Sequence, residues 1–403
     1  MLLIFTAAPR RANLGPDRSI GNRQITNCLK MSRPIVFNAN QTCIQANCPR
    51  AAAGLANRAC VAHRMILRFR DTLRRALASA GLRRMKPALR PDDTVHDFDG
   101  TVKARPGQFA ERSYSNPAGT RAYKVYVPRN YGRARVPLLV MLHGCTQNPD
   151  DFAAGTHMNE LADLDGFLVV YPAQLAAANG ANCWNWFHER DQMRDRGEPS
   201  LIAGITREVA ATYGVDGERI YVAGLSAGAA MAVILGATYP DLFAAVGAHS
   251  GLPYGAAHNV PSAFAAMQGR GTAAFGKPSL GRRPGHPVAP VRSIPTIVFH
   301  GDSDTTVNAI NGSRIVEQAL ALAADHRGAL KKSVQARSAA NGREYTTTIY
   351  RSPRKIAVIE HWVLHGAGHA WSGGSPEGTY TDATGPDASA EMVRFFLSQT
   401  ASA

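Results

Sequence analysis

The sequence predicts an α/β protein built on a mostly parallel sheet with helices on both faces. From Arg121 onward, strand-like apolar segments alternate with helix-like segments, which is the pattern of such a sheet. Pro137–Leu142 is a continuous apolar run of the kind found in strands buried on both faces. Gly224–Gly228 lies between the apolar run Arg219–Ala223 and the small-residue helix start Ala229–Met231, so strand, sharp turn and helix follow one another. Ligands of these sheets bind at the carboxyl ends of the strands.

The individual elements follow from local patterning along the chain. Arg121–Val127 alternates in the manner of an antiparallel strand with one face on a core. Further strands are expected near 137–142, 167–171, 219–223, 243–249, 295–299, 346–350 and 356–364, and helices near 150–165, 200–213, 227–239, 309–324 and 386–400. The Lys331–Lys332 pair is expected in a solvated turn. Segment 251–294, rich in Gly, Pro, His and Ala, is expected as a long surface excursion that could form part of a substrate-binding rim.

The pentapeptide Gly224–Gly228 has the form of a nucleophile elbow, with Ser226 at its centre. A serine hydroxyl is a poor nucleophile, so it needs an imidazole to take its proton and a carboxylate to fix the tautomer of that imidazole. Both follow downstream: Asp302 and Asp304 come after one predicted strand, and His369 comes after a later one. The three groups therefore occur in the chain order serine, acid, histidine.

Five separated motifs together resemble the polyhydroxybutyrate (PHB) depolymerase family of esterases. They are His143–Gln147, Cys183–Trp186, Gly224–Gly228, His300–Val307 and Gly368–Trp371. The resemblance runs from about Ser113 to the C-terminus. It implies an α/β-hydrolase fold, hydrolysis of carboxylic esters through an acyl-enzyme, and no cofactor or metal.

The resemblance also implies a role for each residue of a catalytic triad. Ser226 is expected to attack, and His369 to take and return the proton. In the family pattern the acid lies four positions after the histidine of the His-Gly pair, here His300, which selects Asp304. Asp302 remains the alternative acid.

Two backbone N–H groups are expected to form an oxyanion hole. The residue after the nucleophile, Ala227, supplies one donor, and the resemblance assigns the other to Cys145. Cys145 and Cys183 both follow predicted strands near the catalytic face, and the resemblance points to secretion, so we expect a disulfide between them. Two free thiols are the alternative in a reducing cytoplasm.

Three tryptophans are candidates for a substrate groove, since an aromatic surface suits an apolar polyester chain. They are Trp371, two residues from the expected catalytic histidine, and Trp184 and Trp186. A place in the core is the alternative for all three.

The net charge is concentrated in the N-terminal part of the chain. Residues 1–105 hold 19 Lys and Arg against 6 Asp and Glu, and therefore 13 of the 15 net positive charges of the whole 403-residue chain. We expect 1–105 to be a largely disordered basic extension with an amphipathic helix near 65–84, and 106–403 to be the catalytic domain. An RNA-binding pattern is absent, so no nucleic acid partner is expected, while the helix could pack on the catalytic domain or contact a membrane.

The substrate class rests on the resemblance. It implies short-chain poly(3-hydroxyalkanoate), its oligomers or related small esters. Alternatives are an esterase of acetylated or feruloylated polysaccharide, an acyltransferase with the same triad, and a non-catalytic binding protein. The family suggests an extracellular enzyme, but the start Met1–Phe5 lacks the features of a signal peptide, so a cytoplasmic location is the alternative. The sequence does not indicate an oligomeric state.

Overall fold

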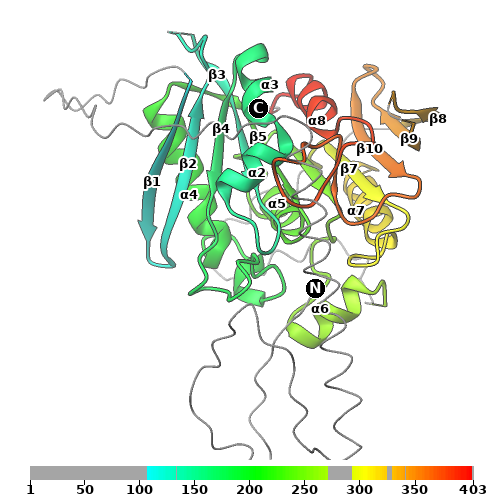
Figure 1. The fold of residues 1–403 in the computed structure, drawn as a ribbon, viewed down its shortest axis with the longest axis horizontal. Helices are drawn as coiled ribbons and strands as arrows, with labels where there is room; N and C mark the ends of the chain where they lie inside the picture. Colours follow the sequence, from blue (N-terminus) through cyan, green and yellow to red (C-terminus); the bar gives the residue numbers. More distant parts are fainter. Residues whose placement is uncertain (1–106, 133, 271–292, 325–328, 341, 402–403) are drawn as a thin grey trace, which may run out of the picture. The chain divides into compact units, whose positions relative to one another are not determined.

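The protein folds around a ten-stranded sheet in the part of the chain that the computed structural model describes, residues 107–132, 134–270, 293–324, 329–340 and 342–401. Its strands are β1 (Gln108–Asn116), β2 (Gly119–Val127), β3 (Val136–Leu142), β4 (Leu168–Pro172), β5 (Val215–Leu225), β6 (Ala245–His249), β7 (Thr296–Gly301), β8 (Lys331–Ser338), β9 (Glu344–Arg351) and β10 (Ala357–Leu364). They lie in the order β1-β2-β4-β3-β5-β6-β7-β10-β9-β8 (Figure 1). The six strands from β4 to β10 in this order pair in parallel, and the two strands at each flank pair antiparallel. The predicted α/β architecture is therefore confirmed.

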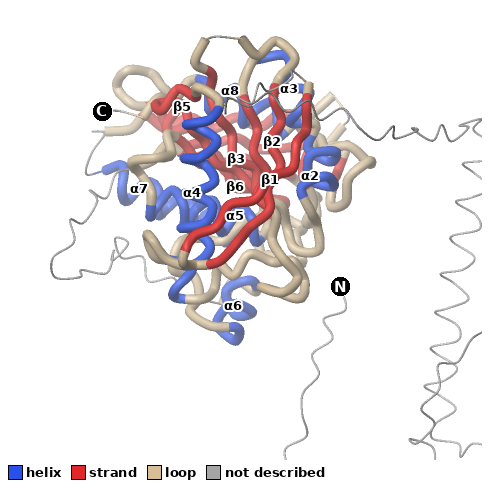
Figure 2. Tube along the Cα trace, turned by 90° about the vertical axis from the view of Figure 1, so that its left-hand side faces the viewer, coloured by secondary structure: helices blue, strands red, loops and turns tan. Residues whose placement is uncertain are grey.

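Helices cover both faces of this sheet. They are α2 (Pro149–Thr156), α3 (Met158–Asp165), α4 (Gly197–Thr212), α5 (Ala227–Thr238), α6 (Val260–Met267), α7 (Ile310–Ala324) and α8 (Ala388–Leu397), with a 3-10 turn η1 (Glu189–Gln192). Figure 2 shows α4 and α7 on one side of the strands and α2 and α3 on the other.

Side chains of the central strands divide between two cores because successive residues of a strand point to opposite faces. In β3, Leu138 and Val140 join a cluster with residues of α4, α5 and α7. Leu139 and Met141 join a second cluster with residues of α2, α3 and α8. A strand buried in this way is continuously apolar, which is why β3 could be predicted from its sequence.

Several local expectations are corrected by the structure. The helix expected over 150–165 is two helices, because His157 adopts a left-handed conformation with φ of 53° and ends α2. The Lys331–Lys332 pair begins strand β8 and does not lie in a turn. The excursion after β6 contains helix α6, whose N-terminus is capped by Asn259 in a capping box with Ser262.

Other expectations fall outside the described residues. The basic extension over 1–105, its helix near 65–84 and much of the segment 251–294 belong to residues 1–106 and 271–292. Among the helices that the structure describes, none combines the length and the apolar character needed to span a bilayer.

The parallel strands place the expected functional residues at one edge of the sheet. Chain segments leave β3, β5, β7 and β10 at their carboxyl ends, and parallel strands present these ends to the same side. Ser226 directly follows β5, and the loops that carry Asp304 and His369 follow β7 and β10. A two-residue pairing of β11 (Trp371–Ser372) with β12 (Thr381–Asp382) continues the last of these loops.

Candidate active site

Ser226 occupies a strained turn between β5 and α5. Its φ of 58° and ψ of −118° lie in a region that side-chain-bearing residues rarely adopt. Its backbone N–H donates to the carbonyl of His249 at 2.9 Å, which ties the turn to the end of β6. This geometry is that of a nucleophile elbow, and it leaves the Ser226 side chain half-buried at the end of the strand.

Two glycines allow this elbow to contact the end of β3. A Cβ atom on Gly228 would lie 2.1 Å from the carbonyl oxygen of Leu142, and one on Gly224 would lie 2.6 Å from the same oxygen. Both contacts are with a backbone atom, and moving a backbone segment costs more free energy than moving the end of a flexible side chain. The Gly-x-Ser-x-Gly pattern is therefore required here for close approach between the elbow and the loop that follows β3.

His369 and Asp304 form a hydrogen-bonded pair. Their Nδ1 and Oδ2 atoms lie 2.7 Å apart, and the Asp304 side chain is fully buried. The other carboxylate oxygen, Oδ1, accepts from the backbone N–H groups of Thr306 and Val307, both at 2.9 Å. Burial alone would raise the pKa of Asp304, but hydrogen bonds from His300, His369 and the Val307 backbone hold it well below its usual value. Asp304 is thus a carboxylate throughout the range in which proteins ordinarily work.

Asp302, the alternative acid, contacts a different histidine. Its Oδ2 lies 2.9 Å from His365 Nδ1, and its Oδ1 accepts from the Gly366 backbone N–H at 2.7 Å. The Asp302 and His365 side chains are both 41% exposed. This pair ties the loop after β7 to the loop after β10 and leaves Asp304 as the carboxylate that meets His369.

The loop after β3 is held in place by hydrogen bonds of the Gln147 side chain. Gly144 N–H donates to Gln147 Oε1 at 2.9 Å, and Gln147 Nε2 donates to Asp151 Oδ2 at 2.8 Å and to the carbonyl of Thr379 at 3.0 Å. Asp151 in turn accepts from the Thr379 N–H at 2.9 Å. We call His143–Gln147 the oxyanion loop, after its expected role.

The two expected oxyanion donors are the backbone N–H groups of Cys145 and Ala227. Among the described residues, the backbone N–H groups of Cys145 and Ala227 donate no hydrogen bond. Ala227 is the first residue of α5, where a helix leaves its N–H groups without intrahelical acceptors. Both amides are thus available to a developing negative charge.

Cys145 and Cys183 form a disulfide, as expected from the sequence. The bond joins the oxyanion loop to the loop after β4. Thr146 N–H also donates to the carbonyl of Ala181 at 2.6 Å, so the two loops are held together by a covalent bond and a hydrogen bond.

The three tryptophans lie in the interior, and the structure does not support their interpretation as an open groove. Trp371 is 1%, Trp184 0% and Trp186 6% exposed. Trp371 donates from Nε1 to Ser389 Oγ at 3.0 Å and packs edge-on against Phe152. Trp184 likewise donates from Nε1 to the carbonyl of His143 at 3.1 Å. A buried indole with an internal acceptor fits the core alternative for Trp371 and Trp184, and the low exposure of Trp186 fits it as well.

His249 is a residue of the site that the sequence did not single out. Its carbonyl accepts from Ser226 N–H, and its Nε2 accepts from Ser372 N–H at 3.0 Å, three residues beyond His369. Its ring stacks on Phe299 and Trp371. The signal available was its position at the carboxyl end of a predicted strand. His249 thus connects the elbow with the loop that carries His369.

Buried neutral histidines make the stability of this fold dependent on pH. Burial lowers the pKa of His143 to about 4, of His249 to about 3 and of His361 to about 4. Below the unfolded value of about 6.5, the unfolded chain binds protons that the native state does not bind, so stability rises with pH. We expect the free energy of unfolding to fall by roughly 5 kcal/mol between pH 6.5 and pH 5, measured by urea denaturation. His361→Gln should reduce this pH dependence by about a third, and an unchanged free energy across the range would contradict the assignment.

A mostly parallel sheet, a serine elbow after one strand, and an acid and a histidine after later strands define an α/β-hydrolase. Residues 121–347 match the family model described as Esterase PHB depolymerase, and the chain belongs to that family. It is 33% identical over 258 residues to poly(3-hydroxyalkanoate) depolymerase C of Paucimonas lemoignei, covering 63% of this chain and 59% of that one.

Other relatives are named for different activities. Over 141 residues the chain is 34% identical to feruloyl esterase B of Neurospora crassa, covering 35% of this chain and 47% of the relative. The chain thus spans less than two thirds of the length of these curated relatives. Among solved structures, an acetyl xylan esterase from Aspergillus awamori matches with a TM-score of 0.56 and 20% identity, covering 72% of this chain and 99% of that one. This last match supports the fold alone.

Proposed function

We propose that this protein is a serine esterase that hydrolyses carboxylic esters through an acyl-enzyme. The observation that carries the proposal is the 2.7 Å contact of His369 Nδ1 with the buried Asp304, on the same sheet edge as the elbow of Ser226. A carboxylate on Nδ1 keeps that nitrogen protonated and leaves Nε2 as the base. Membership of an esterase family supports the same chemistry.

The proposed reaction proceeds in two halves. Ser226 Oγ attacks the ester carbonyl carbon while its proton passes to His369 Nε2, and the amides of Cys145 and Ala227 stabilise the negative charge on the carbonyl oxygen. The C–O bond to the alcohol then breaks, and His369 gives its proton to the departing oxygen. Water repeats the sequence on the acyl-enzyme, releasing the acid and restoring the serine hydroxyl. Asp304 remains ionised and orients the imidazole throughout.

For the substrate, we propose short-chain 3-hydroxyalkanoate oligomers and related small esters. The relative named poly(3-hydroxyalkanoate) depolymerase C matches over more of this chain than the feruloyl esterase does, which favours this class. Acetylated or feruloylated polysaccharide is the second candidate, because a feruloyl esterase matches part of this sequence and an acetyl xylan esterase matches its fold. The Cys145–Cys183 disulfide favours an oxidising, extracellular location.

A substrate panel tests this proposal. We expect the purified protein to hydrolyse p-nitrophenyl acetate and butyrate faster than the octanoate, and to release acid from 3-hydroxybutyrate trimer more rapidly than acetate from acetylated xylan. Adding a competing alcohol distinguishes an acyltransferase, which would yield mainly the new ester. If the folded protein turned over none of these esters, the proposed function would be wrong.

A further inference from the structure

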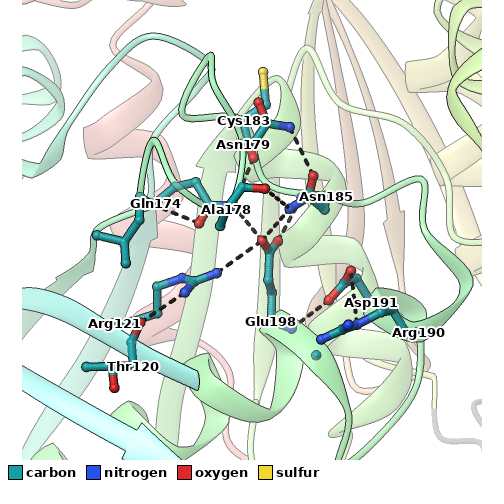
Figure 3. A network of polar contacts seen from close by, with 12 residues as sticks. Thr120, Arg121, Gln174, Ala178, Asn179, Cys183, Asn185, Arg190, Asp191 and Glu198 are labelled. Atoms are coloured by element: carbon teal, nitrogen blue, oxygen red, sulfur yellow. Dashed lines mark hydrogen bonds and ion pairs between the residues drawn. The ribbon is translucent and has the colours of Figure 1, made fainter. Parts of the chain in front are cut away.

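A buried carboxylate binds the segment after β4, which contacts the oxyanion loop. Glu198, in the first turn of α4, is 3% exposed. Its Oε1 accepts from Gln174 Nε2 at 2.5 Å, from Asn185 Nδ2 at 2.8 Å and from Arg121 at 3.4 Å. Its Oε2 accepts from the Asn185 backbone N–H at 2.7 Å. Figure 3 shows these contacts converging on the carboxylate from separate segments of the chain.

Gln174 connects Glu198 to the oxyanion loop on one side. The Gln174 side chain donates to Glu198 and also to the carbonyl of Cys183, at 2.9 Å. The Gln174 backbone N–H donates to His143 Nε2 at 3.1 Å, and His143 is the first residue of the oxyanion loop. Fixing the Gln174 side chain therefore helps to fix its backbone, and with it the imidazole of His143.

Asn185 connects Glu198 to the oxyanion loop on the other side. Both its backbone and its side-chain N–H groups donate to the carboxylate. The preceding residue, Trp184, donates from Nε1 to the carbonyl of His143 at 3.1 Å. Cys183, one residue further back, forms the disulfide with Cys145. Two short chains of contacts thus run from one carboxylate to the segment that carries an expected oxyanion donor.

We propose that Glu198 is the positioning residue of the oxyanion loop, holding Gln174 and Asn185 so that the Cys145 amide stays directed at the reacting carbonyl oxygen. The proposal rests on the proposed esterase function and deepens it. All four partners of the carboxylate are N–H donors, so the site requires a group that only accepts. An amide or a protonated carboxyl would turn a hydrogen toward at least one of these donors.

The energetics favour a positional role over a purely stabilising one. Burial and the neighbouring Asp191 carboxylate raise the pKa of Glu198, and hydrogen bonds from Gln174 and Asn185 oppose this effect. Removing a carboxylate from water is costly, and a buried ion pair adds little net stability compared with apolar residues of similar size. The Arg121 contact is also the longest of the four. The carboxylate instead fixes the positions of Gln174 and Asn185, and through them the position of the oxyanion loop.

Glu198→Gln tests the proposal with nearly the same shape. With its oxygen in the Oε1 position, the amide still leaves the Asn185 backbone N–H without an acceptor. We expect kcat for p-nitrophenyl acetate to fall about tenfold to a hundredfold, less than for outright loss of an oxyanion donor, with KM within about twofold. The control is Glu208→Gln on the same helix, where the carboxylate accepts from Tyr123 and, among the described residues, makes no hydrogen bond to either loop. Its kcat should stay within about twofold of the wild type.

A second readout does not depend on activity. Amide hydrogen exchange, followed by mass spectrometry, should be faster for peptides covering 143–147 in Glu198→Gln than in the wild type or in Glu208→Gln. If Glu198→Gln does not fold, Gln174→Met removes one of the two connections and should show the same two effects at smaller size. Wild-type kcat and exchange in Glu198→Gln, or equal losses in Glu208→Gln, would overturn the inference. A wild-type protein without esterase activity would instead contradict the proposed function, and the exchange measurement would still decide the role of Glu198.

Discussion

Ser226→Ala is expected to lower kcat for a soluble ester by roughly 10⁴-fold to 10⁶-fold. The proposed reaction passes through a covalent bond to Ser226 Oγ, and no other group at the elbow replaces that atom. Alanine and serine both carry a Cβ atom, so the backbone strain at φ of 58° is the same in the variant. The midpoint of thermal unfolding should therefore stay within about 2 °C of the wild type. The measurements are kcat, thermal unfolding and intact mass after treatment with an organophosphate, which should label the wild type once.

The control for this prediction is Ser303→Ala. Within the part of the chain that the structure describes, the one hydrogen bond of Ser303 Oγ is to the exposed Asp302 carboxylate, at 3.2 Å, so the variant should retain wild-type kcat and organophosphate labelling. Labelling of the Ser226→Ala protein at an equal rate would place the nucleophile elsewhere.

Asp304→Asn is expected to lower kcat by roughly 10³-fold to 10⁴-fold, whereas Asp302→Asn should cost less than about tenfold. An asparagine at 304 can present an N–H to His369 Nδ1, which stabilises the tautomer in which Nε2 carries the proton. The pKa of Asp304 is held well below its usual value, so the wild-type carboxylate is ionised and the deficit should persist from pH 5 to pH 8. The comparison is made at saturating substrate.

The opposite ranking would show that the acid has been misassigned. Asp302 binds His365 and the Gly366 backbone, and its substitution should mainly loosen the contact between two loops. A larger loss of kcat in Asp302→Asn than in Asp304→Asn would therefore make Asp302 the group that acts on His369.

The central strands and the order of the candidate site residues were predictable because strong local signals coincide there. Continuous apolar runs such as that of β3 report burial on both faces, and glycines at Gly224 and Gly228 report backbone contact. Parallel strands then place the loops after β5, β7 and β10 at one edge without further information. The disulfide between Cys145 and Cys183 followed from the same placement together with the family resemblance.

The remaining features depend on contacts that local sequence does not report. Strand β8 is exposed on both faces, so its residues show no alternation, and only pairing with β9 makes it a strand. The break at His157 interrupts a segment whose pattern is helical on either side. Glu198 lies in the first turn of a helix, where a glutamate usually faces water, and its burial became visible only with the loops around it. These are tertiary effects that override local preference.

The contact of Asp151 with Thr379 joins residues 228 positions apart in the chain. A nascent polypeptide that has not yet reached Thr379 can already contain the elbow and the oxyanion loop, but Gln147 and Asp151 then lack their distant partner. Contacts between remote segments form slowly, since the entropy of closing a long loop must be overcome first. The proposed esterase is thus expected to reach full activity only after these last long-range contacts have formed.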